Sequence, residues 1–292
     1  MNAEHVPDPT ALWLCQLPGM TAALLRELLA AFGSADAVLR ASSSALRRLG
    51  VAPALVAQLV AGPRQIPHVA AGLKGLQRLG IVPLPFAAPS YPERLQRLSE
   101  PPLVVYVQGP WPLAQPLALI VQPDEIDPRV ATGWEQISAT LRVHAGFAAL
   151  ATAAAAQTRP ALLGVHHGLM LARQRLPQDL WKQVTARSCT LLSICPPTAQ
   201  PDPALAHATY RALAALSDAL VALLPLPAEA DDLLTTARAV GLPMFGLGAT
   251  TRTPLPPAMR RLRPGKSGVR ALSIALGVHP DGTSTIQQER LF

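Results

Sequence analysis

The sequence predicts an α/β protein with a doubly wound, mostly parallel sheet, preceded by a small helical domain. Two features lead to this class. From residue 103 onward, short aliphatic runs bounded by Pro or Gly alternate with segments of helical periodicity, as strands and crossover helices do. Before residue 65, leucines recur at helical spacing and no strand pattern intervenes. A chain of 292 residues is long enough for two such parts.

The composition indicates a well-packed protein with an anionic partner. Half of the residues are hydrophobic and only 15% are charged. The formal net charge is +7, which favours nucleic acid as the partner, with a basic surface that binds nothing as the alternative.

The three cysteines, Cys15, Cys189 and Cys195, make neither a disulfide framework nor a zinc site, because no histidine lies at ligand spacing. The N-terminus is polar and acidic, unlike a signal peptide, and no apolar run reaches the roughly 18 residues of a membrane span. We therefore expect a reducing, cytoplasmic compartment, no membrane partner and no cofactor.

Residues 1–65 are expected to form the helical domain. Thr21 and Ser34 stand at favoured N-cap positions, Ser42 to Ser44 are expected to open the fourth helix, and Pro53 suits the first position of a helix. The expected helices are Ala11–Leu17, Ala22–Phe32, Ala35–Leu39, Ala45–Leu49 and Pro53–Ala61. Their order is similar to a helix-hairpin-helix or SAM-like module, which can hold a phosphate at a helix N-terminus. A module that serves only packing is the alternative.

Residues 66–89 are expected to link the two parts, with a helix over His68–Leu79 and an extended segment over Ile81–Pro85. The main domain is assigned to 90–278, and the polar residues 279–292 are expected to form a loose tail.

In the main domain, the first two aliphatic runs, Leu103–Val107 and Leu117–Val121, are expected to be buried parallel strands. The further expected strands are Phe147–Ala151, Ala161–Val165, Thr190–Ile194, Ala219–Leu224, Pro243–Leu247 and, as a short last one, Ala271–Gly277. The expected helices are Val130–His144, Pro177–Ala186, Ala204–Leu216 and Ala228–Val240. The gap between Phe147–Ala151 and Ala161–Val165 is too short for a crossover helix, so one crossover is expected to be missing.

The turn after Leu117–Val121 is where a parallel-sheet fold places its ligand. Here that turn reads Gln122-Pro123-Asp124-Glu125. It has no glycine and no basic residue, and it puts two carboxylates where an anion is expected.

Several motifs resemble the DNA-processing protein A family (DprA, also called Smf). LPGM and FGS stand near the start, and SYPERLQRLSEPPLVVYVQG spans residues 90–109. The similarity continues through QPLALIV and SICPPTAQP to TTARAVGLPMFGLG, and it covers about residues 10–270. The Tyr-Pro-Glu-x-Leu and Pro-Pro-Leu-x-x-Tyr-x-x-Gly patterns are its most specific parts.

The resemblance implies a helical N-terminal domain and an extended Rossmann-like domain. It also implies a homodimer that binds single-stranded DNA and loads a RecA-type recombinase during natural transformation and recombination, without being an enzyme.

This chain departs from the family at the DNA-binding positions. Where the family has Gly-Ser-Arg after Leu117–Val121, the chain has Gln122, Pro123 and Asp124. A carboxylate there repels phosphate, and the bidentate contact of the arginine is lost. The resemblance therefore implies an eroded pocket.

A second family motif, Ser-Gly-x-Ala-Arg-Gly, corresponds to residues 151–156. Ala151, Thr152 and Ala155 stand at its serine, first glycine and arginine positions, so close approach of a phosphate to a glycine backbone is lost. The family's Arg-Asn-Arg corresponds to residues 209–211, of which Arg211 keeps one arginine.

Basic residues gather instead toward the C-terminus. Within a stretch that contains no acid stand Arg252, Arg260, Arg261, Arg263, Lys266 and Arg270. We predict that these residues contact DNA phosphates, together with Arg211 and, with less support, Arg173 and Arg175. A solvated arginine surface or a protein contact is the alternative.

Three other groups are weaker candidates. His166 and His167 are adjacent on a strand end, where successive side chains point opposite ways, which does not favour a metal site. The acidic cluster at 124–127 could hold Mg²⁺ with phosphates, but no phosphate loop accompanies it. Ser193 lacks the flanking glycines of a nucleophile elbow.

The sequence thus favours a non-catalytic, DprA-like protein that binds single-stranded DNA and loads a recombinase. Two alternatives stay open. One is a scaffold that keeps the fold and has lost DNA binding, and the other, weaker, is a nucleotide-processing Rossmann enzyme. Convergence of the residues in 252–270 with Arg211 on one face supports DNA binding, and dispersal supports a scaffold.

Overall fold

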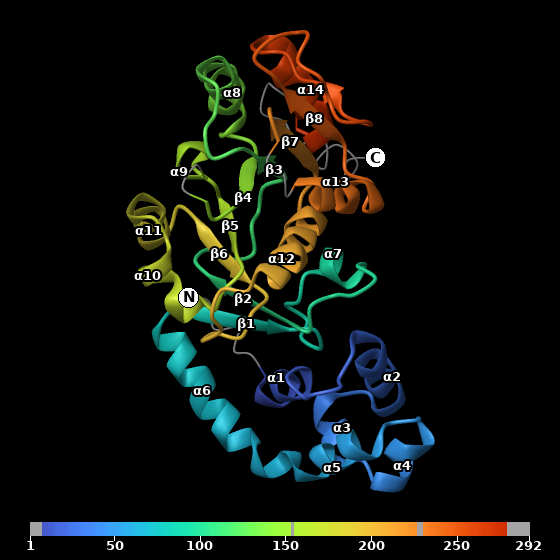
Figure 1. Cartoon of the computed structure of the whole chain (residues 1–292). Coiled ribbons are helices and arrows are strands. Elements are labelled where there is room, and N and C mark those ends of the chain that lie inside the picture. The colour runs from blue at the N-terminus through green and yellow to red at the C-terminus, as the bar shows by residue number, and fades with distance from the viewer. Residues whose placement is uncertain (1–7, 153–154, 227–229, 279–292) are drawn as a thin grey trace, which may run out of the picture.

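The structure, a computed structural model, describes residues 8–152, 155–226 and 230–278. A cluster of short helices lies beneath a large twisted sheet, and one long helix runs from that cluster to the edge of the sheet (Figure 1). The residues expected to form a loose tail lie outside the described part of the chain.

The N-terminal cluster forms where the caps and breaks predict it. Its helices are α1 (Pro9–Cys15), α2 (Ala22–Phe32), α3 (Ala35–Arg40), α4 (Ser43–Arg48) and α5 (Pro53–Ala61). The side chains of Thr21 and Ser34 accept backbone N–H groups in the first turns of α2 and α3, which confirms these N-caps. Of the three serines expected to open the next helix, Ser42 is the N-cap of α4. A 3₁₀ turn, η1 (Gly62–Arg64), then leads into α6 (Ile66–Arg78).

The sheet confirms the predicted fold class. Its nine strands lie in the order β1-β2-β6-β5-β4-β3-β7-β8-β9, and every pair from β6 to β9 is parallel. The strands are β1 (Ile81–Pro85), β2 (Val104–Gln108), β3 (Leu117–Val121), β4 (Gly146–Leu150), β5 (Leu162–Val165), β6 (Thr190–Ser193), β7 (Ala219–Leu223), β8 (Met244–Leu247) and β9 (Arg260–Arg261).

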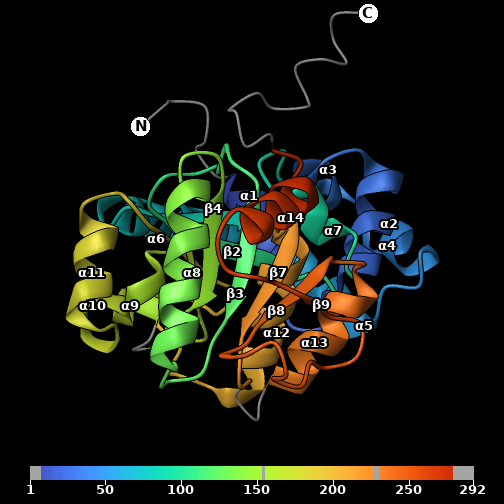
Figure 2. The ribbon, with the colours of Figure 1, turned by 90° about the horizontal axis from the view of Figure 1, so that it is seen from above.

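Helices cover both faces of this sheet (Figure 2). On one face, α8 (Pro128–Leu141) and α14 (Lys266–Leu276) pack on Ala118 and Ile120 of β3. On the other face, α12 (Pro203–Leu216) and α13 (Ala230–Ala239) pack on the alternate residues of the strands. Shorter helices are α7 (Glu93–Gln96), α9 (Ala155–Thr158), η2 (Leu169–Leu171), α10 (Ala172–Arg175) and α11 (Gln178–Thr185).

The prediction that the Leu103–Val107 run is a parallel strand is wrong. β2 pairs antiparallel with both β1 and β6, in register with Tyr106 opposite Pro83 and Ser193. The side chains of an all-aliphatic strand are buried equally well whether the strand runs parallel or antiparallel to its neighbours, so the sequence of the run does not indicate its direction. The direction comes from β1, which lies in the segment 66–89 and folds back against β2.

The prediction of a missing crossover between the third and fourth expected strands is also wrong. β4 and β5 are parallel neighbours, with Ala148 opposite Leu162. Residues 151–161 make the crossover with the one-turn helix α9 instead of a full one. Ala155 in this turn is fully buried.

The last predicted strand, Ala271–Gly277, is instead the second half of the helix α14. Its apolar run is short enough to suit either element. Helical spacing becomes visible only with the upstream residues, since Val269, Leu272 and Leu276 are the buried positions. Gly277 ends the helix in the left-handed conformation, with φ of 65°.

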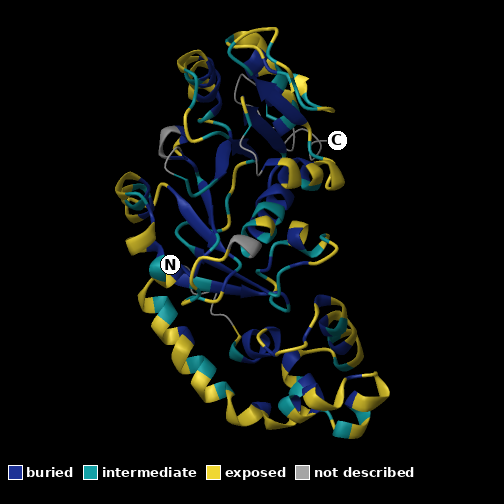
Figure 3. Ribbon diagram, viewed as in Figure 1, coloured by how far each residue is buried: buried dark blue, intermediate teal, exposed yellow. Residues whose placement is uncertain are grey.

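The helical cluster is attached to the sheet by specific contacts. Gln16 donates to the hydroxyl of Tyr106 on β2, and Arg26 of α2 donates to the carbonyl of Gln96 at the end of α7. Burial is deepest in the central strands, whereas α6 exposes most of its surface (Figure 3). The domain boundaries at 65, 89 and 278 stay a prediction. Within the described residues, no helix is long and apolar enough to cross a membrane.

Gly168, between β5 and η2, packs closely against the backbone of Pro197, so a substitution at this position tests the packing there. A Cβ atom there would lie 2.2 Å from the carbonyl oxygen of Pro197, which is backbone and cannot move aside easily. We expect Gly168→Ala to lower the free energy of unfolding by about 1–3 kcal/mol. Urea denaturation followed by circular dichroism measures this.

Gly75→Ala in α6 is the matched control, because nothing lies within 4 Å of the added methyl group. This change is expected to raise the free energy of unfolding by about 0.5–1 kcal/mol through helix propensity. Equal effects of the two substitutions would contradict the packing around Gly168.

Candidate functional site

The switch point of the sheet lies between β3 and β7. The chain winds from β3 through β4 and β5 to β6, and then returns past β3 to β7 and β8. The carboxyl ends of β3 and β7 therefore flank the position at which doubly wound proteins bind ligands. The residues that follow β3 are the predicted eroded pocket.

At this point Gln122 is turned inward and Asp124 is exposed. Neither polar atom of the Gln122 amide has a hydrogen-bond partner in the described chain. Asp127 is the N-cap of α8 and accepts the backbone N–H of Arg129 at 2.7 Å. With Pro123 and two exposed carboxylates, this turn presents no basic side chain to an anion.

The second half of the predicted eroded pocket follows β4. Ala151 donates its N–H to the carbonyl of Gly164, and Thr152 donates to that of Leu150, so these N–H groups are already used. Ala155 is fully buried. The arginine position of the family motif is therefore occupied by a methyl group inside the core.

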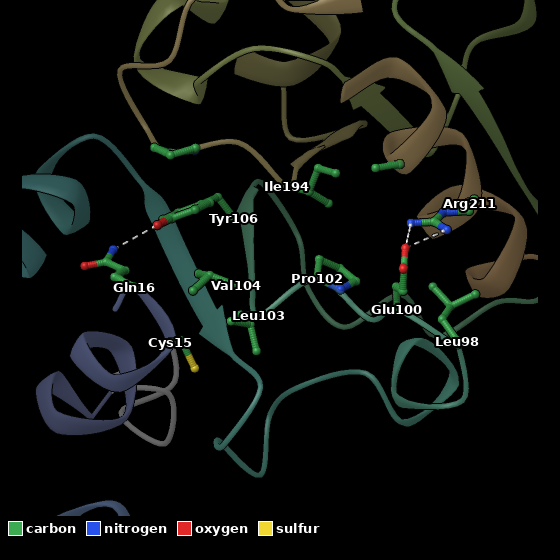
Figure 4. Close-up of a pocket in the computed structure, with 12 residues that line it drawn as sticks. Cys15, Gln16, Leu98, Glu100, Pro102, Leu103, Val104, Tyr106, Ile194 and Arg211 are labelled. Atoms are coloured by element: carbon green, nitrogen blue, oxygen red, sulfur yellow. Dashed lines mark hydrogen bonds and ion pairs between the residues drawn. The ribbon is translucent and has the colours of Figure 1, made fainter. Parts of the chain in front are cut away.

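Arg211 projects from α12 into a cavity of ≈ 580 Å³ between the helical cluster and the sheet (Figure 4). Its two terminal nitrogens both donate to one oxygen of Glu100, each at 3.3 Å. The side chain of Arg211 is 36% exposed, and that of Glu100 is 78% exposed. The positive charge predicted to meet DNA is thus already offset by a carboxylate.

The other end of this cavity lies against the helical cluster. Cys15 and Gln16 at the end of α1 face Val104 and Tyr106 of β2 (Figure 4). Burial raises the pKa of the Tyr106 hydroxyl, while the hydrogen bond from Gln16 opposes that rise. A cavity of this size admits a small organic ligand, but its main polar groups are already paired with one another.

The basic residues near the C-terminus lie around β9 and α14, at the opposite edge of the sheet from β1 (Figure 1). Five of them are exposed and form no ion pair with any residue that the structure describes: Arg252, Arg260, Arg263, Lys266 and Arg270. Arg261 differs, because its guanidinium donates to the carbonyls of Thr250 and Thr253 and braces that loop.

The predicted basic residues do not converge on one face. Arg211 belongs to α12, whereas Lys266 and Arg270 belong to α14 on the other face of the sheet. Arg173 and Arg175 lie on α10, which follows η2 beside β2 and β6, far from β9 (Figure 1). Three separate basic surfaces result.

The weaker candidates are explained by packing. His167 is buried, and its ring Nδ1 lies 3.0 Å from the carbonyl oxygen of Gly168. Burial is the main cause that lowers the pKa of His166, and the neighbouring His167 lowers it further. The Ser193 hydroxyl donates to the carbonyl of His167 and accepts the N–H of Cys195. No group of three or more His, Cys, Asp or Glu in the described residues could hold a metal ion.

At the level of sequence, no family model and no curated protein matches this chain. A solved structure does match. DNA processing protein A from Streptococcus pneumoniae superposes with a TM-score of 0.65, covering 91% of this chain and 98% of that one at 14% identity. The fold is that of DNA processing protein A. The structure of DprA from Helicobacter pylori overlaps less, with a TM-score of 0.49, 16% identity and coverage of 72% of this chain and 93% of that one.

The DprA fold thus extends over both the helical cluster and the sheet. The ≈ 580 Å³ cavity lies between these two parts. Glu100, Gln16 and Tyr106 were not predicted as part of any site. No local signal marks them, because Glu100 and Arg211 are separated by 111 residues in sequence.

Cys15 allows a test of how closed this cavity is. Burial raises the pKa of its thiol to about 11 and that of Cys189 to about 12, and it also raises that of Cys195. A raised thiol pKa leaves little thiolate at about pH 8, and the thiolate is the reactive form. We expect slow reaction of the folded protein with a disulfide reagent such as DTNB.

After unfolding in guanidinium chloride, all three thiols should react rapidly. Comparison with Cys15→Ser assigns the contribution of the cavity cysteine. Fast labelling of Cys15 in the folded protein would show that the cavity is open at the sulfur.

Proposed function

We propose that this chain is a DprA-like DNA-processing protein that binds single-stranded DNA without catalysis. The observation that carries the proposal is the group of exposed, unpaired cations Arg260, Arg263, Lys266 and Arg270. Lys266 and Arg270 are one helical turn apart on α14 and project from the same side. Four unpaired charges of one sign suit a phosphate backbone, which supplies a negative charge at regular spacing.

The other predicted contacts have smaller roles in this proposal. Arg261 positions the loop beside the exposed group, since its hydrogen bonds go to that loop. Arg211 would have to exchange its ion pair with Glu100 for a contact with a phosphate. That contact would lie on the face of the sheet opposite Lys266 and Arg270 of α14. Arg173 and Arg175 could contact single-stranded DNA only if the DNA passes around the β2–β6 end of the sheet.

The setting that we propose is the one implied by the resemblance: a homodimer that loads a RecA-type recombinase on single-stranded DNA. The fold supports this setting because the whole length of the S. pneumoniae protein, 98%, has a counterpart here. The eroded turn at Gln122, Pro123 and Asp124 implies that the contact surface has moved from the switch point to β9 and α14.

A scaffold that does not bind DNA is the second candidate. The observation in its favour is that Arg211 and the β9–α14 cations lie on opposite faces of the sheet. Its surface would then serve a protein partner.

The first experiment is fluorescence anisotropy of a labelled single-stranded oligonucleotide across a salt series, with duplex as competitor. We expect binding that prefers single strands and weakens steeply with salt. In the variant Arg260→Ala, Arg263→Ala, Arg270→Ala, the slope of log K against log salt should fall by about 0.7 for each lost phosphate contact.

A matched variant removes the same charge elsewhere, by Arg40→Ala, Arg47→Ala and Arg48→Ala in the helical cluster, where all three side chains are exposed. It should keep the slope of the parent protein. Absence of binding at low salt, or equal losses in both variants, would reject the proposal and leave the scaffold.

A further inference from the structure

A second cavity, of ≈ 370 Å³, lies at the amino edge of the parallel strands, away from the switch point at their carboxyl edge. It is enclosed by the end of α8, the start of β4, the turn before β5 and α11. Its side chains include Gln115, Arg142, Phe147, Arg159, Gln183 and Ser188. No carboxylate is among the described residues that line it.

Arg142, the C-cap of α8, is the unusual member of this cavity. Its Nε and Nη2 atoms are buried and have no acceptor among the described residues. The remaining Nη1 lies 3.9 Å from Oε1 of Glu135. A buried charged donor without an acceptor is strongly destabilising, so such groups are normally met by a protein acceptor, water or a ligand.

The two unpaired donors are buried atoms on one edge of the guanidinium, where Nε–H and one Nη2–H run nearly parallel. This edge matches two oxygens of a phosphate or carboxylate. The guanidinium is held over the ring of Phe147, with its Cζ atom 5.9 Å from the ring centroid. The ring of Phe147 packs edge-on against Trp134, with the two ring centroids 5.2 Å apart, which holds the Phe147 ring in place under Arg142.

Arg159 brings a second positive charge to the same cavity, and it forms no ion pair within the described part of the chain. Its backbone is left-handed, with φ of 47°, a conformation that residues other than glycine rarely adopt. Glu135 offsets part of the charge of Arg142, and Arg159 adds a second positive charge, so the cavity has an excess of positive charge that suits a phosphate.

We propose that this cavity binds a phosphomonoester, with Arg142 as a bidentate ligand and Arg159 as the second cation. Pockets of roughly 300–1,000 Å³ hold small organic ligands, so this one admits a phosphate with a small attached group. The phosphate can belong to a free mononucleotide or to the 5′ end of a DNA strand. The site does not depend on the β9–α14 surface or on the function proposed for it.

Isothermal titration calorimetry of the full chain with deoxyadenosine monophosphate, inorganic phosphate and deoxyadenosine tests this site. The two phosphates should bind and the nucleoside should not. Binding should weaken as the pH falls below about 6, because the phosphate takes up its second proton while both arginines stay charged. No heat with either phosphate up to about 10 mM would overturn the proposal.

Arg142→Lys keeps the positive charge but loses the paired donors, and it should weaken phosphate binding about tenfold or more. Arg129→Gln, an exposed position in the first turn of the same helix, is the matched control and should bind like the parent. If Arg142→Lys fails to fold by circular dichroism, Arg159→Gln serves as the second variant. Full binding by the folded cavity variants, or an equal loss in the control, would reject the site.

Oligonucleotides with and without a 5′-phosphate distinguish the two sources. A 5′-phosphate preference that Arg142→Lys abolishes assigns the site to strand ends. Binding of the mononucleotide alone, with no such preference, assigns it to a free ligand. The Arg260, Arg263 and Arg270 variant should keep mononucleotide binding, so failure of one proposal does not look like failure of the other.

Discussion

The central strand β3 is the constraint on which the rest of the sheet depends. All five of its residues are buried, so every backbone N–H and C=O group must find a partner inside the protein. β4 and β7 supply these partners on either side, and the Asp218 carboxylate accepts the N–H of Leu117 at 2.9 Å. Because the chain leaves β3 in one direction and returns past it in the other, α8 and α12 must cover opposite faces.

That winding decides which cations can act together. Arg211 is carried by α12 and Arg270 by α14, so the sheet separates two groups that a linear reading of the sequence places in one site. Their electrostatic states also differ. Glu100 offsets the charge of Arg211, whereas Arg270 and its neighbours on β9 and α14 have no ion-pair partner within the described chain. The unpaired group is therefore the better phosphate contact.

The same winding creates two edges with different chemistry. At the carboxyl edge, Asp124 and Glu125 follow β3 and the turn is closed to anions. At the amino edge, Arg142 and Arg159 border a cavity with no lining carboxylate. Negative charge has thus collected at the edge where this fold usually binds its ligand. A net positive charge, with Glu135 offsetting one of the two arginines, lies at the edge where it usually does not.

The sequence by itself determined the helix starts, most strand positions and the loss of glycine and arginine after β3 and β4, because these depend on residues within a few positions of one another. Thr21, Ser34 and Ser42 cap their helices through bonds to backbone three residues away. The direction of β2, the one-turn crossover α9 and the helical state of Ala271–Gly277 were decided by packing between distant segments. The same holds for the pairing of Arg211 with Glu100 and for the open donors of Arg142. No local pattern encodes such contacts, since each exists only once the sheet has brought its members together.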